Sequence, residues 1–216
     1  MIKIVVMRKF KVILICMLMA KTAYTQDMPD KGNFSLGMRS TSSLFSSEDA
    51  KFGSGAGGQF RIQFTNRINS DWFADYITTN IANAGRRIDA HIGWSVLFYP
   101  FLSESKLQPY VIAGHCFDYT RIQAFSTPYT NNSLIDTERW SSAVQMGLGS
   151  HFRLTERFDL SFNAQYMIHI GNDVHAHVVE SIGGINTLEI TEEKGAGVEG
   201  HILLTFSVNY IIADLW

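Results

Sequence analysis

The segment at residues 158–170, FDLSFNAQYMIHI, alternates apolar and polar side chains without interruption. An alternation with a period of two predicts a β-strand with one apolar and one polar face. Strands in soluble domains usually have about five or six residues, whereas a strand that crosses a membrane at a tilt needs about 9–11. This segment is long enough to cross a bilayer. Its apolar face is therefore either part of a buried core or a surface that contacts lipid.

The same kind of segment recurs along the chain. Eight strands are predicted, at residues 34–39, 59–65, 72–77, 88–98, 109–119, 144–153, 158–170 and 202–210. In the fifth of them the alternation is ambiguous, so the sequence does not assign its two faces. After the N-terminal segment no apolar run approaches the 18 residues that indicate a transmembrane helix. An even number of strands is typical of bacterial single-chain membrane barrels.

Long and short connections between the predicted strands roughly alternate. Long connections are expected at residues 44–58, 120–139 and 171–197, a medium loop at 78–87, a compact turn at 99–109, and short turns at 66–71 and 155–157. Outer-membrane barrels have long extracellular loops and short periplasmic turns. We therefore expect the odd-numbered connections to lie outside the cell. The glycine-rich stretch at residues 53–58, GSGAGG, is expected to be a flexible loop, because no strand–helix context of a phosphate-binding motif surrounds it.

The polar face of these strands carries many charges. The residues predicted to face inward are Arg39, Arg61, Asp75, Asp89, His91, His151, Arg153, Asp159 and His169, together with Asn163 and Gln165. A soluble core could not contain them, because burying unpaired charges costs several kcal/mol each. The opposite face requires an apolar surrounding, and a sheet in lipid must close on itself. The sequence predicts an all-β fold, an eight-stranded antiparallel up-and-down transmembrane β-barrel, with these residues as a network that fills the lumen. No open channel is expected.

The N-terminal segment has the features of a secretory signal peptide. Residues 1–25 contain a basic start, an apolar core at 12–20, and small residues before the predicted cleavage point. The predicted barrel domain is residues 26–216. The segment at 1–25 holds five of the 18 Lys and Arg residues and none of the 20 Asp and Glu residues, so the remainder carries a net charge of −7. This charge argues against nucleic acid as a partner. One cysteine, Cys116, remains, which excludes an intramolecular disulfide.

Aromatic side chains cluster near the predicted strand ends. Near the expected periplasmic turns lie Trp72, Phe98, Tyr99, Tyr110 and Phe158, and near the external rim lie Tyr119 and Trp140. Aromatic rings favour the interface between membrane and water. We therefore expect these residues to form two girdles around the barrel.

This layout resembles the small outer-membrane β-barrel superfamily of the OmpA, OmpX and opacity-protein type. The segments LQPYVIAGHCFDY and YPF resemble the outer-membrane β-barrel domain of Bacteroidota, including PorT-like proteins. The last strand, HILLTFSVNYIIADLW, resembles the C-terminal signal read by the barrel assembly machinery, although Asp214 departs from that pattern. The resemblance spans residues 32–212. It implies a monomer in the outer membrane of a Gram-negative bacterium, surrounded by outer-membrane lipid and inserted by that machinery.

Candidates for chemistry are few. His175 and His177, two residues apart in an extended chain, could form a metal site with Asp173, but a solvated external loop with two histidines is the favoured explanation. Some barrels of similar layout hydrolyse acyl chains of lipid A with a His, a Ser and an acidic residue. Such enzymes have a serine two residues after the histidine, whereas the residue two positions after His169 is Gly171. A soluble, lipocalin-like barrel fits the strand lengths poorly.

We therefore predict a structural or surface-interaction role through the external loops, with a possible extracellular or envelope protein as partner. A lipid A-modifying, acyl hydrolase-like enzyme is the alternative function. The sequence identifies no catalytic residue and no cofactor.

Overall fold

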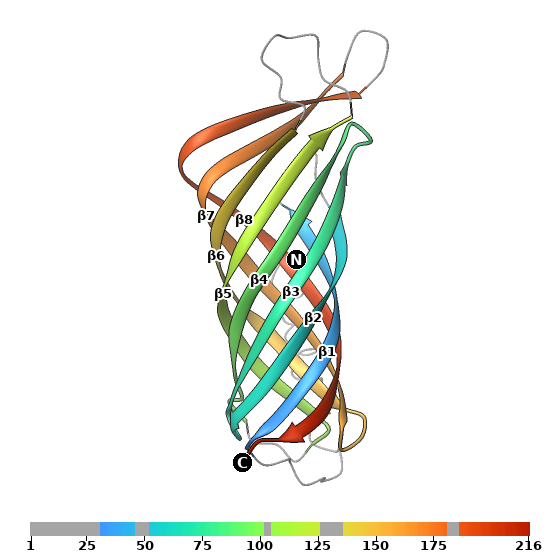
Figure 1. The fold of residues 1–216 in the computed structure, drawn as a ribbon, viewed down its shortest axis with the longest axis vertical. Helices are drawn as coiled ribbons and strands as arrows, with labels where there is room; N and C mark the ends of the chain where they lie inside the picture. The colour runs from blue at the N-terminus through green and yellow to red at the C-terminus, as the bar shows by residue number, and fades with distance from the viewer. Residues whose placement is uncertain (1–30, 46–51, 102–104, 126–135, 181–185) are drawn as a thin grey trace, which may run out of the picture.

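The computed structural model describes residues 31–45, 52–101, 105–125, 136–180 and 186–216, so the predicted signal peptide at residues 1–25 lies outside it. The described chain forms eight strands (Figure 1). They are β1 (Asn33–Phe45), β2 (Phe52–Thr65), β3 (Ile68–Ile81), β4 (Gly85–Phe98), β5 (Leu107–Ala124), β6 (Asp136–Arg153), β7 (Phe158–Glu180) and β8 (Asn186–Asp214). No helix within these ranges is long and apolar enough to cross a membrane.

The strands form a closed antiparallel barrel in sequence order. Each strand pairs with the next, and β1 pairs with β8 from Asn33↔Asp214 to Phe45↔His201. Closure leaves no unpaired edge in the barrel wall, which is the condition for placing a sheet in lipid. We call the end of the barrel that contains the chain's C-terminus the lower end, as in Figure 1, and the opposite end the upper end.

The two faces of each strand differ sharply in composition. On β7, Phe158, Phe162 and Tyr166 are exposed, whereas the intervening Ser161 and Gln165 are buried inside the barrel. The other strands share this division, and their exposed residues include large apolar side chains such as Leu36, Met38, Phe60, Trp94, Met146, Leu148, Phe206 and Val208. The barrel thus has an apolar outer surface and a largely polar interior.

The strands are longer, and the connections shorter, than the sequence predicts. The GSGAGG stretch at residues 53–58 is not a loop but part of β2, where it pairs with both β1 and β3. The connection expected at 78–87 is reduced to a tight turn after Ile81, in which Ala82 and Asn83 adopt left-handed backbone angles of 47° and 60°. Asn80 supports this turn by accepting a hydrogen bond from the backbone N–H of Asn83 at 2.7 Å.

The expected loop at residues 171–197 is also wrong, because most of it is strand. Strands β7 and β8 continue to pair with each other from Asp173↔Glu193 up to Glu180↔Asn186, after a register shift next to Gly171. By contrast, β6 pairs with β7 only as far as Ser142↔Ile170. The paired residues 171–180 and 186–197 therefore form a two-stranded ribbon beyond the barrel wall, which we call the β7–β8 ribbon.

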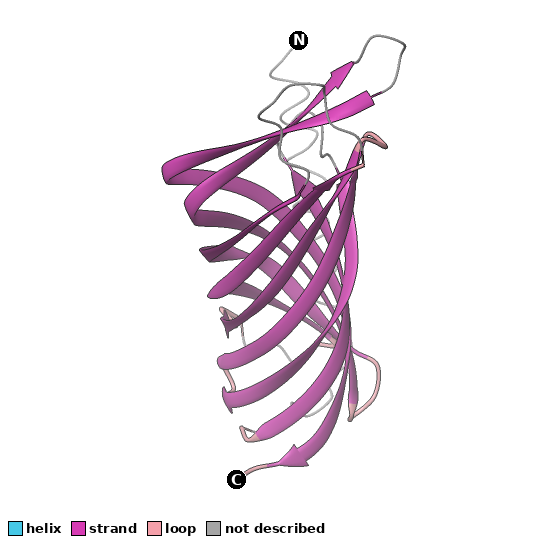
Figure 2. Cartoon of the chain, turned by 45° about the horizontal axis from the view of Figure 1, so that its top comes forward, coloured by secondary structure: helices cyan, strands magenta, loops and turns pink. Residues whose placement is uncertain are grey.

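The β7–β8 ribbon leans across the upper end of the barrel (Figures 1 and 2). Its buried apolar residues pack against residues from the β3–β4 turn and from β5; this cluster consists of Val174, Leu188 and Ile190 from the ribbon and Ile81, Ala84, Ile122 and Ala124 from the barrel. The side-chain amide of Asn186 donates to the backbone carbonyl of Ala82 at 3.3 Å. The ribbon is thus held on the far side of the barrel mouth by apolar contacts.

Two of the expected girdle aromatics face inward instead. Tyr99 and Tyr110 are buried, and their rings contact each other at a centroid distance of 5.8 Å. Trp72, Phe98, Phe158 and Trp140 are exposed on the outer surface. Tyr99 faces inward because its hydroxyl has a hydrogen-bond partner inside the barrel, the Nε2 atom of His151 at 2.7 Å.

Candidate functional site

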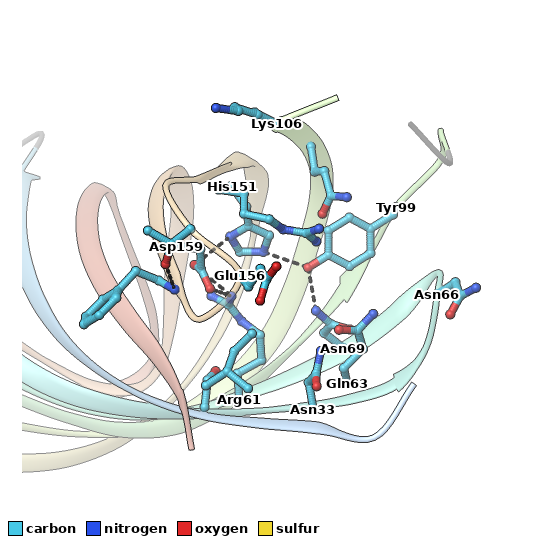
Figure 3. Close-up of a pocket in the computed structure, with 16 residues that line it drawn as sticks. Asn33, Arg61, Gln63, Asn66, Asn69, Tyr99, Lys106, His151, Glu156 and Asp159 are labelled. Atoms are coloured by element: carbon cyan, nitrogen blue, oxygen red, sulfur yellow. Dashed lines mark hydrogen bonds and ion pairs between the residues drawn. The ribbon is translucent and has the colours of Figure 1, made fainter. Parts of the chain in front are cut away.

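The lower half of the lumen contains a cluster centred on Arg61. Its guanidinium donates to Asp71 at 2.7 Å from Nε and to Asp159 at 3.2 Å from Nη1. Its second terminal nitrogen donates to Ser161 at 3.2 Å. Ser161 also lies 2.7 Å from Nδ1 of His151. Together with Tyr99 these residues form the lower cluster. Four of its members line a small pocket at this end, namely Arg61, Tyr99, His151 and Asp159 (Figure 3).

A second ion pair lies above the lower cluster. Nε of Arg39 lies 2.9 Å from Asp75 Oδ1, and both side chains are almost fully buried. The guanidinium of Arg39 also stacks on the Phe73 ring at 4.3 Å. A chain of amide hydrogen bonds joins this pair to the lower cluster, because Gln59 accepts from Arg39 at 3.4 Å and donates to Asn209 at 2.6 Å. Asn209 in turn donates to Asp159 at 2.9 Å.

The upper half of the lumen is built from histidines and carboxylates. Asp118 lies between two imidazoles, 3.1 Å from His91 Nε2 at Oδ1 and 2.9 Å from His169 Nδ1 at Oδ2. His169 Nε2 contacts His201 Nδ1 at 3.2 Å, and their rings are stacked with centroids 4.8 Å apart. Asp89 belongs to the same group. We call Asp89, His91, Asp118, His169 and His201 the upper cluster.

The upper cluster is connected to its surroundings by hydroxyls and one arginine. Arg87 donates from Nε to both oxygens of Asp89, at 3.0 and 3.1 Å. The Thr120 hydroxyl lies 2.8 Å from Asp89 and 3.2 Å from Asp118. Apolar side chains occupy neighbouring inward positions on the same strands, and this buried group is Phe73, Ile77, Cys116, Ala143, Met167 and Leu203. The lumen is therefore filled by alternating charged and apolar contacts.

The nine residues predicted to face the lumen fall into two groups. Five of them belong to the lower half and are joined there by hydrogen bonds and ion pairs, namely Arg39, Arg61, Asp75, Asp159 and His151. Asp89, His91 and His169 belong to the upper cluster. The ninth residue, Arg153, is half-buried at the lower end, where it lines the pocket together with Asp159.

The three residues proposed as a metal site from the sequence lie in the β7–β8 ribbon. His177 is exposed and pairs with Glu189 across the ribbon. The backbones of Asp173 and His175 are part of β7, but their side chains lie outside the described residues. Nothing in the described part of the ribbon brings these three side chains together.

The sequence did not reveal four important lumen residues. Asp118 lies in the strand whose alternation is ambiguous, and His201 precedes the predicted start of the last strand by one position. Asp71 and Arg87 were placed in connections. Two of them could have been found from the sequence. His201 lies two residues before Leu203, and Arg87 two residues before Asp89, so extending each predicted strand places both side chains on the inward face.

Comparison with known proteins shows the fold. No protein-family model matches the chain, and no curated protein matches it. Among solved structures, a major outer membrane protein from Thermus thermophilus has a TM-score of 0.52 at 11% identity, covering 82% of this chain and 99% of that one. The chain therefore has the fold of an outer-membrane β-barrel, which confirms the predicted fold class.

Two further structures are similar to this chain. Neisserial surface protein A, NspA, has a TM-score of 0.51 at 16% identity and covers 86% of this chain and 100% of its own. The outer membrane protein OprG from Pseudomonas aeruginosa has a TM-score of 0.51 at 12% identity, with 85% and 98% covered. At these identities the similarity shows the fold alone.

Proposed function

We propose that this chain is an integral outer-membrane β-barrel of a Gram-negative bacterium, exported by residues 1–25, with a closed lumen and a structural or surface-interaction role. The observation that carries the proposal is the apolar outer surface, where Met38, Leu148 and Phe206 are exposed while Arg39, Arg61 and Asp75 are buried inside. Water outside such a surface is unfavourable by about 25 cal/mol per Å² of apolar area. A bilayer removes that cost.

The contents of the lumen support a closed barrel. The Arg61 and Arg39 ion pairs cross the lower half, and the β7–β8 ribbon packs over the upper mouth. An eight-stranded barrel is wide enough only for its own side chains. We therefore propose that ions and solutes do not pass through it, and that the barrel acts as a rigid support.

The upper end is the proposed extracellular surface. The β7–β8 ribbon exposes His177, Val179, Glu189 and Thr191 on the side that does not pack on the barrel. Binding residues are often presented by segments supported on a rigid scaffold. We propose that a protein partner of the cell surface or envelope contacts this ribbon, and that the barrel itself is a monomer inserted by the barrel assembly machinery.

A pair of outward substitutions tests the membrane location. Leu204 and Tyr210 both face outward on β8, Leu204 about midway along the barrel and Tyr210 near its lower end. Leu204→Arg should destabilise the folded barrel by about 2–4 kcal/mol, and Tyr210→Arg by about 0–1 kcal/mol, because the cost of a cation is greatest at the midplane. Unfolding by urea in lipid vesicles measures both. Equal costs, or a protein that stays in solution without detergent, would refute the location.

Electrical recording tests the closed lumen. The purified barrel, folded as judged by different gel migration before and after boiling, is inserted into a planar lipid bilayer. We expect no stepwise conductance from the wild type. Regular single-channel steps from the wild-type protein would contradict the proposal of a closed lumen without affecting the membrane location.

One contact favours a lipid-hydrolysing enzyme as the second candidate. On the outer, lipid-facing surface His115 Nε2 lies 2.5 Å from the hydroxyl of Ser142, a geometry in which imidazole can act as base towards a serine nucleophile. The nearest acidic groups on that face pair elsewhere, Glu138 with Tyr119 and Asp136 with Arg121. Mass spectrometry of lipid A from cells expressing wild type or Ser142→Ala tests this candidate. Identical lipid A in both strains and in cells without the gene would exclude it.

A further inference from the structure

Three buried side chains in the upper cluster bring metal-ligand atoms close together. Asp89, His91 and Asp118 each offer one ligand atom, and these atoms all lie within 4.8 Å of one another. His91 and Asp118 are direct cross-strand partners of β4 and β5, and Asp89 precedes His91 by two residues on the same face. The barrel wall itself, and not a loop, therefore positions the group.

The contact between His91 and Asp118 is a single buried pair, in which His91 Nε2 lies 3.1 Å from Asp118 Oδ1. The other ring nitrogen of His91, Nδ1, is buried and has no hydrogen-bond partner among the described residues. Both side chains are almost completely buried. Polar atoms buried in this way are costly unless something satisfies them. A cation shared by the imidazole nitrogen and the carboxylate oxygen would satisfy both.

The neighbouring contacts leave the necessary lone pairs available. Ser141 donates to Asp118 Oδ2 at 3.2 Å, so the other oxygen, Oδ1, remains turned towards His91. The Thr120 hydroxyl lies within reach of Asp89 Oδ1 and Asp118 Oδ2, but its single proton serves only one of them at a time. Asp89 Oδ2 accepts from Arg87 and keeps its second lone pair.

We propose that Asp89, His91 and Asp118 bind a divalent transition-metal ion of the zinc type inside the barrel. One imidazole nitrogen and two carboxylate oxygens form a donor set that Zn²⁺ accepts in proteins. The described charged contacts of Asp118 are to imidazoles and not to arginine, so the ion supplies a permanent positive charge that this carboxylate otherwise lacks. His169 lies beside the other oxygen of Asp118 and orients the carboxylate. The inference rests on the barrel fold and not on the proposed surface role.

Zinc binding to the refolded protein tests the site. The full-length mature barrel is refolded in detergent with EDTA or with ZnCl₂, excess metal is removed, and bound zinc is measured by elemental mass spectrometry. We expect one zinc per wild-type barrel. His91→Gln and Asp118→Asn should each weaken zinc binding at least about tenfold. The control His115→Gln changes an outward imidazole on the same strand as Asp118 and should leave binding unchanged.

A second control separates the lumen from the β7–β8 ribbon. The double variant His175→Ala/His177→Ala removes the two histidines of the ribbon and should retain zinc. The proposal is overturned if the wild type retains no zinc, or if the ribbon variant loses zinc while His91→Gln keeps it. If the lumen variants do not fold, X-ray absorption at the zinc edge of the wild type decides: a shell of imidazole and carboxylate supports the site, and a shell that contains sulfur or only water contradicts it.

Discussion

The lower and upper halves of the lumen both bury carboxylates, but different groups lie opposite these carboxylates in each half. In the lower half Arg61 provides a guanidinium to Asp71 and Asp159, and this group is charged at any physiological pH. In the upper half Arg87 pairs with Asp89, but Asp118 faces the imidazoles of His91 and His169 instead of a guanidinium. The carboxylates of the lower half are therefore held by arginine, whereas Asp118 in the upper half depends on imidazoles or, as proposed above, on a metal ion.

The largest expected effect comes from removing the arginine of the lower cluster. Arg61→Met leaves the carboxylates of Asp71 and Asp159 without their cation, and breaking a buried pair from one side costs about 3–5 kcal/mol. Urea unfolding in lipid vesicles, followed by tryptophan fluorescence, measures the loss. Arg67→Met, which changes an exposed arginine in the β2–β3 turn, is the control and should cost less than about 1 kcal/mol. Similar values for the two variants would show that the lower ion pairs do not hold the barrel.

A neutral substitution in the upper cluster should cost less. In EDTA, Asp118→Asn keeps an oxygen that can accept from Ser141 and removes a charge that faces imidazoles and not a guanidinium. We expect a loss of about 1–3 kcal/mol, the usual cost of disturbing buried hydrogen bonds. The same unfolding experiment applies. A loss as large as that of Arg61→Met would mean that Asp118 is held as strongly as a carboxylate paired with arginine, and the contrast between the halves would fail.

The smallest effect on global stability is expected from the β7–β8 ribbon. Leu188 is fully buried against Ile81 and Ile122, but the ribbon strands pair only with each other there. Leu188→Ser should release the ribbon locally and change the unfolding of the barrel little. We expect trypsin to cleave after Lys194 about tenfold faster, which corresponds to a local opening that is about 1.4 kcal/mol more favourable.

The control for this variant is Val179→Ser on the exposed side of the same ribbon, which should be cleaved at the wild-type rate. If Leu188→Ser lowers the stability of the whole barrel as much as Asp118→Asn, the ribbon is an integral part of the upper half rather than a cover over it.

The faces of the strands could be predicted from the sequence, but their ends could not. Phe162 and Asn163 are assigned correctly because the outer surface and the lumen of a barrel require opposite chemistry on neighbouring residues. At residues 53–58 the alternation is hidden by glycines inside the wall: Gly57 pairs with Arg39 and Asp75, and an added Cβ there would collide with the Asp75 carboxylate. At residues 171–197 the strands continue beyond the wall, where the sequence has the composition of a loop.

The histidine cluster was missed for a related reason. A narrow lumen must be filled completely, so β5 has apolar residues on both faces: Ile112 and Cys116 inside, and Val111 and Phe117 outside. Because both faces of β5 are apolar, the sequence does not show which of its residues face inward. The inward position of Asp118 could therefore not be predicted. The meeting of Asp118 with His91 and His169 also depends on the register between strands, which a single sequence does not contain.

The pairing of β1 with β8 has a consequence for how the protein is made. Asn33 pairs with Asp214 and Leu44 with Ile202, so the last seam of the wall joins residues from opposite ends of the chain. Such distant pairings form slowly, because the whole intervening polypeptide must be ordered before they stabilise anything. The first strand has no second neighbour until the final strand has been synthesised. Until then the apolar side chains of the wall can aggregate, so the topology itself requires that they be kept covered before the barrel closes.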